Sequence, residues 1–148
     1  MLTLAAMVLM TPVPPAEAAF YAELEKSSYL NVVMVPAELK EIREASLPFS
    51  HQGENYGQRG YGFVIQPGEC LKLSFSSIAM KEMEVLLGVP PTSHPMLQCL
   101  MKINRMPKVL RMREMKLPNT TTEPQTVVLQ ITGRRASNYK VMVERSKI

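Results

Sequence analysis

Short apolar runs separated by turn residues fill most of the chain after Gly60. In Tyr61–Gln66 and again in Cys70–Ser76, apolar side chains alternate with other residues. A period of two is typical of a strand that buries one face, because successive side chains of a strand point to opposite sides. Between the two runs, Pro67 fixes φ at the first turn position and Gly68 supplies a positive φ at the next, which favours a type II turn. This stretch therefore predicts two strands whose apolar faces belong to one core.

The same alternation predicts more short strands further along the chain. Met83–Leu87, Cys99–Ile103, Val127–Thr132 and Tyr139–Glu144 alternate clearly, and Val109–Met115 does so more ambiguously. Seven or eight short strands with turn signals between them, and no helical spacer, indicate an all-β antiparallel β-sandwich or barrel. The residues that we expect in its core are Leu73, Phe75, Val85, Leu129, Tyr139 and Val141.

The first 19 residues have the pattern of a secretory leader. Residues 1–10 are mainly apolar, and prolines then lead to the small-x-small sequence Ala16-Glu17-Ala18. This arrangement predicts a signal peptide that is cleaved after Ala18 or Ala19, although the positively charged start of such a peptide is missing. The segment is therefore interpreted as a signal peptide or a truncated leader, with a core strand or helix as the alternative. Its apolar part is too short to span a membrane.

The region between the leader and the sandwich is expected to hold one strand, one helix and a loop. Residues 28–35 are rich in β-forming side chains. Residues 36–45 begin with Pro and place Leu39 and Ile42 at helical spacing, which predicts one short helix. Three glycines and many polar residues in 46–60 predict a loop. The resulting organisation is a leader at 1–19, a strand, helix and loop at 20–59, and a β-sandwich at 60–148.

Three stretches between Gly60 and Glu144 form a series of strand motifs: YGFVIQPGECLKLSF, MEVLL and TVVLQITGRRASNYKVMV. They resemble the bacterial pre-peptidase C-terminal domain. The resemblance implies a small jelly-roll-like β-sandwich of secreted proteins, a non-catalytic module that helps secretion, stability or surface binding. Members of that family sometimes bind calcium through Asp in the middle of the domain. This chain contains no Asp, so no calcium site is carried over from the resemblance.

Positive charge is concentrated in the last third of the chain. From Cys99 to Ile148 there are eleven Lys or Arg against three Glu, whereas Met1 to Gln98 has six against ten. Such a concentration forms either a patch for an anionic partner, which is a polysaccharide, phospholipid headgroups or nucleic acid, or a solvated strand face whose charges protect sheet edges from aggregation. The pattern favours the strand face, and the partners expected if the patch binds one are a protein or an anionic polysaccharide of the cell surface. Nucleic acid is disfavoured, because no aromatic residues are interleaved with the basic ones to stack bases. The candidate ligand-binding residues are Lys108, Arg111, Arg113, Arg134 and Arg135, of which the adjacent pair is expected at a hairpin tip.

No catalytic residue set is found in the sequence. The chain has neither Asp nor a G-x-S-x-G motif, which argues against a Ser-His-Asp hydrolase. It has no C-x-x-C pair, and His51 and His94 stand in loop-like surroundings, so neither a metal nor a cofactor is expected. Cys70 and Cys99 form a disulfide after export or remain buried free thiols. The position of Cys70, one residue out of phase with Leu71, favours free thiols.

Together these features favour a secreted or periplasmic, non-catalytic β-sandwich that acts as a binding or structural module. The alternative is an intracellular basic accessory protein that contacts nucleic acid or a ribonucleoprotein. The N-terminus of the mature protein discriminates between the two, because a signal peptide is removed on export.

Overall fold

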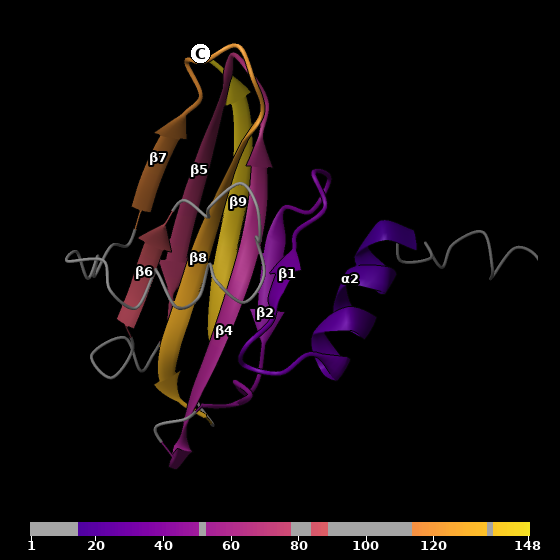
Figure 1. Ribbon diagram of the computed structural model, residues 1–148, viewed down its shortest axis with the longest axis vertical. Coiled ribbons are helices and arrows are strands. Elements are labelled where there is room, and N and C mark those ends of the chain that lie inside the picture. The colour runs from indigo at the N-terminus through magenta and orange to yellow at the C-terminus, as the bar shows by residue number, and fades with distance from the viewer. Residues whose placement is uncertain (1–14, 51–52, 78–83, 89–113, 136–137) are drawn as a thin grey trace, which may run out of the picture.

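The structure is a computed structural model that describes residues 15–50, 53–77, 84–88, 114–135 and 138–148. These residues form two packed β-sheets and one helix (Figure 1). The predicted all-β sandwich is therefore confirmed. In chain order the elements are α2 (Pro15–Lys26), β1 (Val32–Met34), β2 (Glu41–Glu44), β3 (Phe49–Ser50), β4 (Gly53–Ile65), β5 (Glu69–Ser76), β6 (Glu84–Gly88), β7 (Glu114–Pro118), β8 (Gln125–Arg134) and β9 (Tyr139–Lys147).

Each sheet combines strands that are far apart in the sequence. The first sheet has the strand order β1-β4-β8-β6, with the short strand β3 also paired to β4. All of its pairings are antiparallel except that of β1 with β4. β4 and β8 pair from Tyr56 opposite Arg134 to Ile65 opposite Gln125. The second sheet has the order β2-β9-β5-β7 and is antiparallel throughout.

The turn at Pro67-Gly68 forms as predicted. Gly68 has a φ of 76°, and the backbone N–H of Glu69 donates to the carbonyl of Gln66 at 3.0 Å. The turn joins β4 of one sheet to β5 of the other, so these strands do not pair with each other. The expectation of one shared core is confirmed, because the apolar residues of both strands are buried in it. They are Tyr61, Phe63 and Ile65 from β4 and Leu71, Leu73 and Phe75 from β5.

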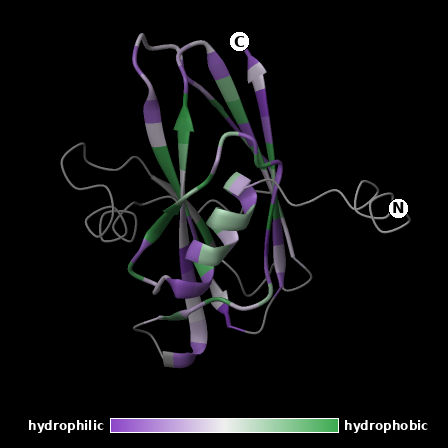
Figure 2. Cartoon of the chain, turned by 90° about the vertical axis from the view of Figure 1, so that its right-hand side faces the viewer, coloured by the Kyte–Doolittle hydropathy of each residue, from purple (hydrophilic) through white to green (hydrophobic). Residues whose placement is uncertain are grey.

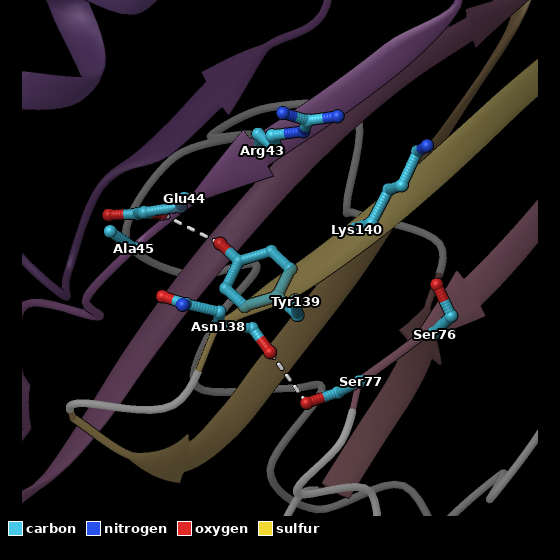
Figure 3. A pocket seen from close by; sticks show the side chains of 8 residues that line it. All are labelled: Arg43, Glu44, Ala45, Ser76, Ser77, Asn138, Tyr139 and Lys140. Carbon is cyan, nitrogen blue, oxygen red and sulfur yellow. Dashed lines mark hydrogen bonds between the residues drawn. The ribbon is translucent and has the colours of Figure 1, made fainter.

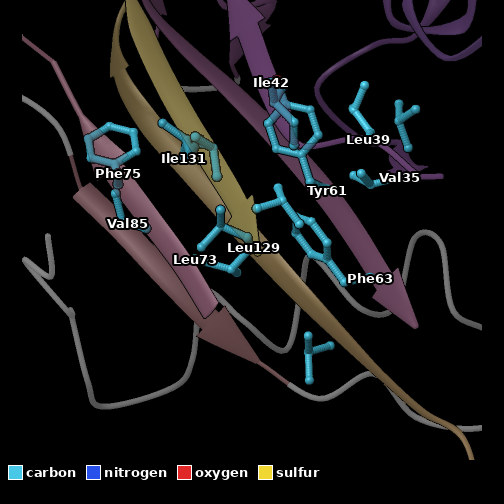
Figure 4. Close-up of a cluster of buried hydrophobic side chains, with 14 of the residues drawn as sticks. Val35, Leu39, Ile42, Tyr61, Phe63, Leu73, Phe75, Val85, Leu129 and Ile131 are labelled. Atoms are coloured by element: carbon cyan, nitrogen blue, oxygen red, sulfur yellow. The ribbon is translucent and has the colours of Figure 1, made fainter. Parts of the chain in front are cut away.

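The hydrophobic core lies between the two sheets (Figure 4). Each of the six residues predicted for the core exposes 5% or less of its surface. The alternation of buried and exposed residues breaks on β8, where Val128 and Gln130 lie on the opposite face from Leu129 and are buried as well. A strand that is buried on both faces in this way is less easily recognised from its period.

Helix α2 covers the side of the sandwich where the edge strands β1 and β2 lie (Figures 1 and 2). Its buried side chains, Phe20 and Leu24, are four residues apart and therefore share one helix face. The Phe20 ring centroid lies 6.2 Å from that of Tyr61, and the Tyr21 hydroxyl donates to the Glu41 carbonyl at 3.2 Å. The helix thus extends the core beyond the edge of the sheets.

The helix predicted at 36–45 is wrong. Its second half is β2, which pairs with β9 from Glu41 opposite Met142 to Glu44 opposite Tyr139. Pairing with β9 provides backbone hydrogen bonds and buries Ile42 completely, and these tertiary contacts override a weak local preference for helix. The one helix that the structure describes lies earlier, at α2.

The loop predicted at 46–60 is also wrong, because it contains β3 and the first part of β4. One of its glycines, Gly57, lies inside a strand and allows Leu47 to approach the backbone closely. A Cβ atom on Gly57 would lie 2.2 Å from the Cβ atom of Leu47. Glycine inside a strand often marks such an approach of another backbone, and here it was mistaken for a loop signal.

The remaining strand predictions are confirmed where the structure describes them. Met83–Leu87 corresponds to β6, Val127–Thr132 to β8 and Tyr139–Glu144 to β9, with shifts of one or a few residues at the ends. Of Val109–Met115, the described part is the beginning of β7. The predicted strand Cys99–Ile103, residues 109–113 and the leader residues 1–14 lie outside the described residues.

Candidate functional site

A buried arginine on β4 connects the end of α2 with β2. Only 2% of the Arg59 side chain is exposed. Its guanidinium donates from Nε and Nη2 to the two carboxylate oxygens of Glu44, at 3.2 and 3.1 Å. It also donates from Nη2 to the Leu24 carbonyl at 3.0 Å and from Nη1 to the Ser27 hydroxyl at 2.5 Å. Every nitrogen of this guanidinium therefore has an acceptor.

Two tyrosines complete the surroundings of Glu44. The hydroxyls of Tyr61 and Tyr139 donate to its Oε2 atom at 2.9 and 2.7 Å and also contact each other. Burial raises the pKa of both phenols well above 10, and the Glu44 carboxylate raises the pKa further. Both phenols consequently stay protonated and act as hydrogen-bond donors to the carboxylate.

Arg59, Glu44, Tyr61 and Tyr139 form what we call the buried polar cluster, which is structural. Both carboxylate oxygens accept hydrogen bonds from within the cluster, which fixes the carboxylate and offsets its charge. The positive charge of Arg59 lies next to the Leu24 carbonyl in the last turn of α2, where it interacts favourably with the negative end of the helix dipole. The cluster therefore holds α2 on the sandwich.

The two described candidate arginines lie where β8 ends. They do not stand at a hairpin tip, as predicted, because β8 and β9 belong to different sheets and the chain crosses between the sheets here. The guanidinium carbon of Arg135 lies 3.3 Å from the centroid of the Phe49 ring, a cation–π contact. The Nε atom of Arg135 is buried and has no hydrogen-bond partner among the described residues. Arg134 is exposed and stands opposite Tyr56 of β4.

Exposed aromatic rings surround these arginines. Phe49 exposes 48% of its surface and Tyr56 exposes 47%. Arginine and aromatic residues are enriched at the centres of protein interfaces. We call the four residues the arginine tip; they are Phe49, Tyr56, Arg134 and Arg135.

Two open hollows flank Arg135. One has a volume of about 520 Å³, lies next to α2 and is lined by Arg43 and Arg59 among others. The other has a volume of about 510 Å³ and is lined by Ser46, Glu54, Asn55, Arg134 and Arg135. Arg135 lines both hollows, so a partner in either one lies next to this residue.

A larger hollow of about 830 Å³ opens beside the ends of β2, β5 and β9 (Figure 3). Lys140 stands opposite Arg43 on one side and opposite Ser76 on the other, so the three side chains form a row across three strands. At the rim, the Ser77 hydroxyl donates to the Asn138 carbonyl at 2.6 Å (Figure 3). We call this the serine hollow; its lining residues are Arg43, Glu44, Ala45, Ser76, Ser77, Asn138, Tyr139 and Lys140.

The structure brings together only part of the predicted ligand site. Arg134 and Arg135 are adjacent at the arginine tip. Phe49 was not predicted, because it lies in the segment predicted as a loop, and Arg43 was not predicted, because it lies in the segment predicted as a helix. Recognising 41–44 as a strand would have placed Arg43 on a sheet surface. The other candidates, Lys108, Arg111 and Arg113, lie outside the described residues.

The prediction that Cys70 points to the opposite face of its strand from Leu71 is confirmed. Leu71 is fully buried, whereas its neighbour Cys70 is half-buried on the other face of β5 and carries a free thiol. Cys99 lies outside the described residues.

Within the described ranges, no three His, Cys or Glu side chains gather into a group that could hold a metal ion. None of the described helical segments has the length and hydrophobicity to cross a membrane.

Comparison with known proteins gives similar solved structures and no significantly similar sequence. No family model matches the chain, and no curated protein matches it significantly. The chain is similar to PliG from Aeromonas hydrophila, a periplasmic inhibitor of g-type lysozyme, with 11% identity and a TM-score of 0.45 over 78% of this chain and 97% of that one. It is also similar to the pre-peptidase C-terminal domain of collagenase from Bacillus anthracis, with 11% identity and a TM-score of 0.40 over 77% of this chain and 93% of that one. The second structure represents the family that the motifs between Gly60 and Glu144 resemble.

Proposed function

We propose that this protein is a secreted or periplasmic, non-catalytic binding module that holds the carboxylates of a protein partner at its arginine tip. The observation that carries the proposal is the state of Arg135. Its guanidinium is held against the exposed Phe49 ring in a cation–π contact, and the residue lines two open hollows. A guanidinium that is held in place loses little conformational freedom when it binds a carboxylate, and planar carboxylates accept two parallel bonds from it.

The surroundings of Arg135 favour a protein over a small ion as the partner. Phe49 and Tyr56 place two exposed rings beside two arginines, and rings of this size contribute most when a partner surface covers them. Arg134 adds a second positive charge at the same end of β8. We therefore expect a partner surface that combines acidic side chains with apolar ones.

The arrangement of α2 supports export of the protein. The buried helix residues, Phe20 and Leu24, come after the predicted cleavage site at Ala18 or Ala19, and so does Tyr21, which bonds to β2. Residues 15–19 are exposed or half-exposed. Removal of a leader that ends there would therefore leave the contacts of α2 with the sandwich in place.

We expect a chain that begins at Ala19 to be as stable as the full chain, to within about 0.5 kcal/mol, because the removed residues that the structure describes, 15–18, are exposed or half-exposed. A chain that begins at Tyr21 differs by only two residues, yet it lacks Phe20 and should be about 2 kcal/mol less stable. Urea unfolding of the three chains measures this difference. A large loss in the Ala19 chain would contradict cleavage at this site. N-terminal sequencing of the protein from its native host tests the cleavage directly, and an intact Met1 would count against export.

The arginine tip is tested with a fluorescent peptide of alternating Glu and Leu, and with its Lys and Leu counterpart as a negative control. We expect the acidic peptide to bind at low salt and the double variant R134Q/R135Q to weaken binding by about tenfold or more, since hydrogen bonds between charged groups are lost. Fluorescence anisotropy measures both affinities.

The matched control is K116Q/K147Q, which removes the same charge from two exposed lysines outside the tip. If both double variants weaken binding equally, net charge rather than the tip attracts the peptide and the proposal fails. Absence of binding by the unmodified protein also contradicts it. A single-stranded oligonucleotide that binds more tightly than the peptide would instead support the intracellular, nucleic-acid-binding alternative.

A further inference from the structure

The serine hollow carries two cations that share one anion. Arg43 of β2 and Lys140 of β9 stand directly opposite each other, an arrangement that like charges normally disfavour. Glu41 lies between them, with its carboxylate 2.8 Å from Arg43 Nε and 3.5 Å from Lys140 Nζ. The Arg43 side chain is 71% exposed, and its two terminal nitrogens have no acceptor among the described residues. One positive charge at this edge is therefore left without a counter-charge.

Neutral hydrogen-bonding groups line the same hollow. Ser76 is exposed and stands opposite Lys140, and Asn138 is exposed at the start of β9. Neither the Ser76 hydroxyl nor the Asn138 side-chain amide bonds to another described residue. Each can both donate and accept, which is what a ligand with several hydroxyl groups requires. Ala45 adds an apolar surface to the lining (Figure 3).

We infer that the serine hollow binds a carboxylated sugar, such as a uronic acid unit of an acidic polysaccharide, with its carboxylate at the terminal nitrogens of Arg43 and its hydroxyls toward Ser76 and Asn138. The volume of about 830 Å³ lies within the range of small-molecule sites. The residues that would hold the sugar do not include Arg134 or Arg135. This inference is therefore independent of protein binding at the arginine tip.

Isothermal titration calorimetry tests the inference with three probes: tetragalacturonate, the neutral maltotetraose, and citrate, which carries carboxylates without a sugar ring. We expect tetragalacturonate to bind and the other two to bind at least about tenfold more weakly, because each lacks one of the two recognised groups. The variant R43Q/K140Q should lose about tenfold or more of the tetragalacturonate affinity. Its melting temperature shows whether the fold is retained.

Two control variants locate the site. Lys72 lies on the outer face of the same sheet between Glu114 and Glu144, so K72Q removes a paired lysine away from the hollow and should bind as the unmodified protein does. S76A should weaken sugar binding without changing the net charge. Loss of binding in R134Q/R135Q but not in R43Q/K140Q would assign the sugar to the arginine tip and overturn the inference. Equal affinity for citrate, equal affinity for maltotetraose, or no binding of tetragalacturonate would each overturn it as well.

Discussion

Replacing Arg59 by Met is expected to lower the free energy of unfolding by about 3–5 kcal/mol, because the substitution leaves a carboxylate buried without its cation. Glu44 keeps the two tyrosine donors but loses both hydrogen bonds from the guanidinium. The Leu24 carbonyl loses one of its donors, and the Ser27 hydroxyl loses the guanidinium that donates to it. Urea unfolding followed by circular dichroism measures the change.

Two further variants test whether the loss in R59M comes from the buried ion pair of Arg59 with Glu44. R43M removes an arginine whose ion pair with Glu41 is exposed, so its effect should stay below about 1 kcal/mol. The double variant R59M/E44Q removes the stranded charge and should recover part of the stability lost in R59M. If R59M costs no more than R43M, the buried polar cluster does not hold α2 on the sandwich.

The strands between Gly60 and Glu144 could be predicted from the sequence because apolar residues alternate along them, including β8, which is buried on both faces. Leu73, Val85 and Leu129 each belong to a series of apolar residues at every second position of a strand. The hydrophobicity of the side chains is therefore enough to predict that these residues lie in the core. The Pro67-Gly68 turn was equally predictable, since its conformation depends on two adjacent residues. Local patterns of this kind need no knowledge of which strands pair.

The pairing of strands could not be predicted, and the buried polar cluster depends on it. Glu44, Tyr61 and Tyr139 meet although as many as 95 positions separate them. In the sequence, Arg59 lies among glycines and polar residues in a segment that reads as a loop. A charged residue in such a segment is normally exposed, and only the position of α2 over β4 makes its burial understandable.

The candidate sites show the same limit. The arginines at the end of β8 were visible as a charge pair, whereas the aromatic ring that fixes one of them lies 86 positions earlier in the chain, at Phe49. The row of Arg43, Lys140 and Ser76 exists only through the register of β2, β9 and β5. Binding surfaces built across strands therefore become visible only when the register is known.

Replacing Phe75 by Ala is expected to destabilise the protein by about 3–5 kcal/mol, as for other buried aromatic residues. Phe75 exposes 5% of its surface, and its ring stacks on that of Tyr139 with a centroid distance of 5.9 Å. It also stands opposite Val141 on β9, so the truncation opens a cavity between the pair of strands and the rest of the core. A loss of this size is comparable with the whole stability of a marginal domain. Differential scanning calorimetry and urea unfolding measure it.

Phe49 provides the matched control, because it is the same residue type with 48% of its surface exposed. F49A removes the cation–π contact with Arg135 and little buried area, so it should cost about 1 kcal/mol or less. F75L keeps most of the apolar volume and should lie between the two alanine variants. Equal losses in F75A and F49A would mean that the sandwich does not bury the face of β5 that carries Phe75. A large loss in F75A alone supports the placement of this face in the core between the two sheets, next to the tyrosines that hold Glu44.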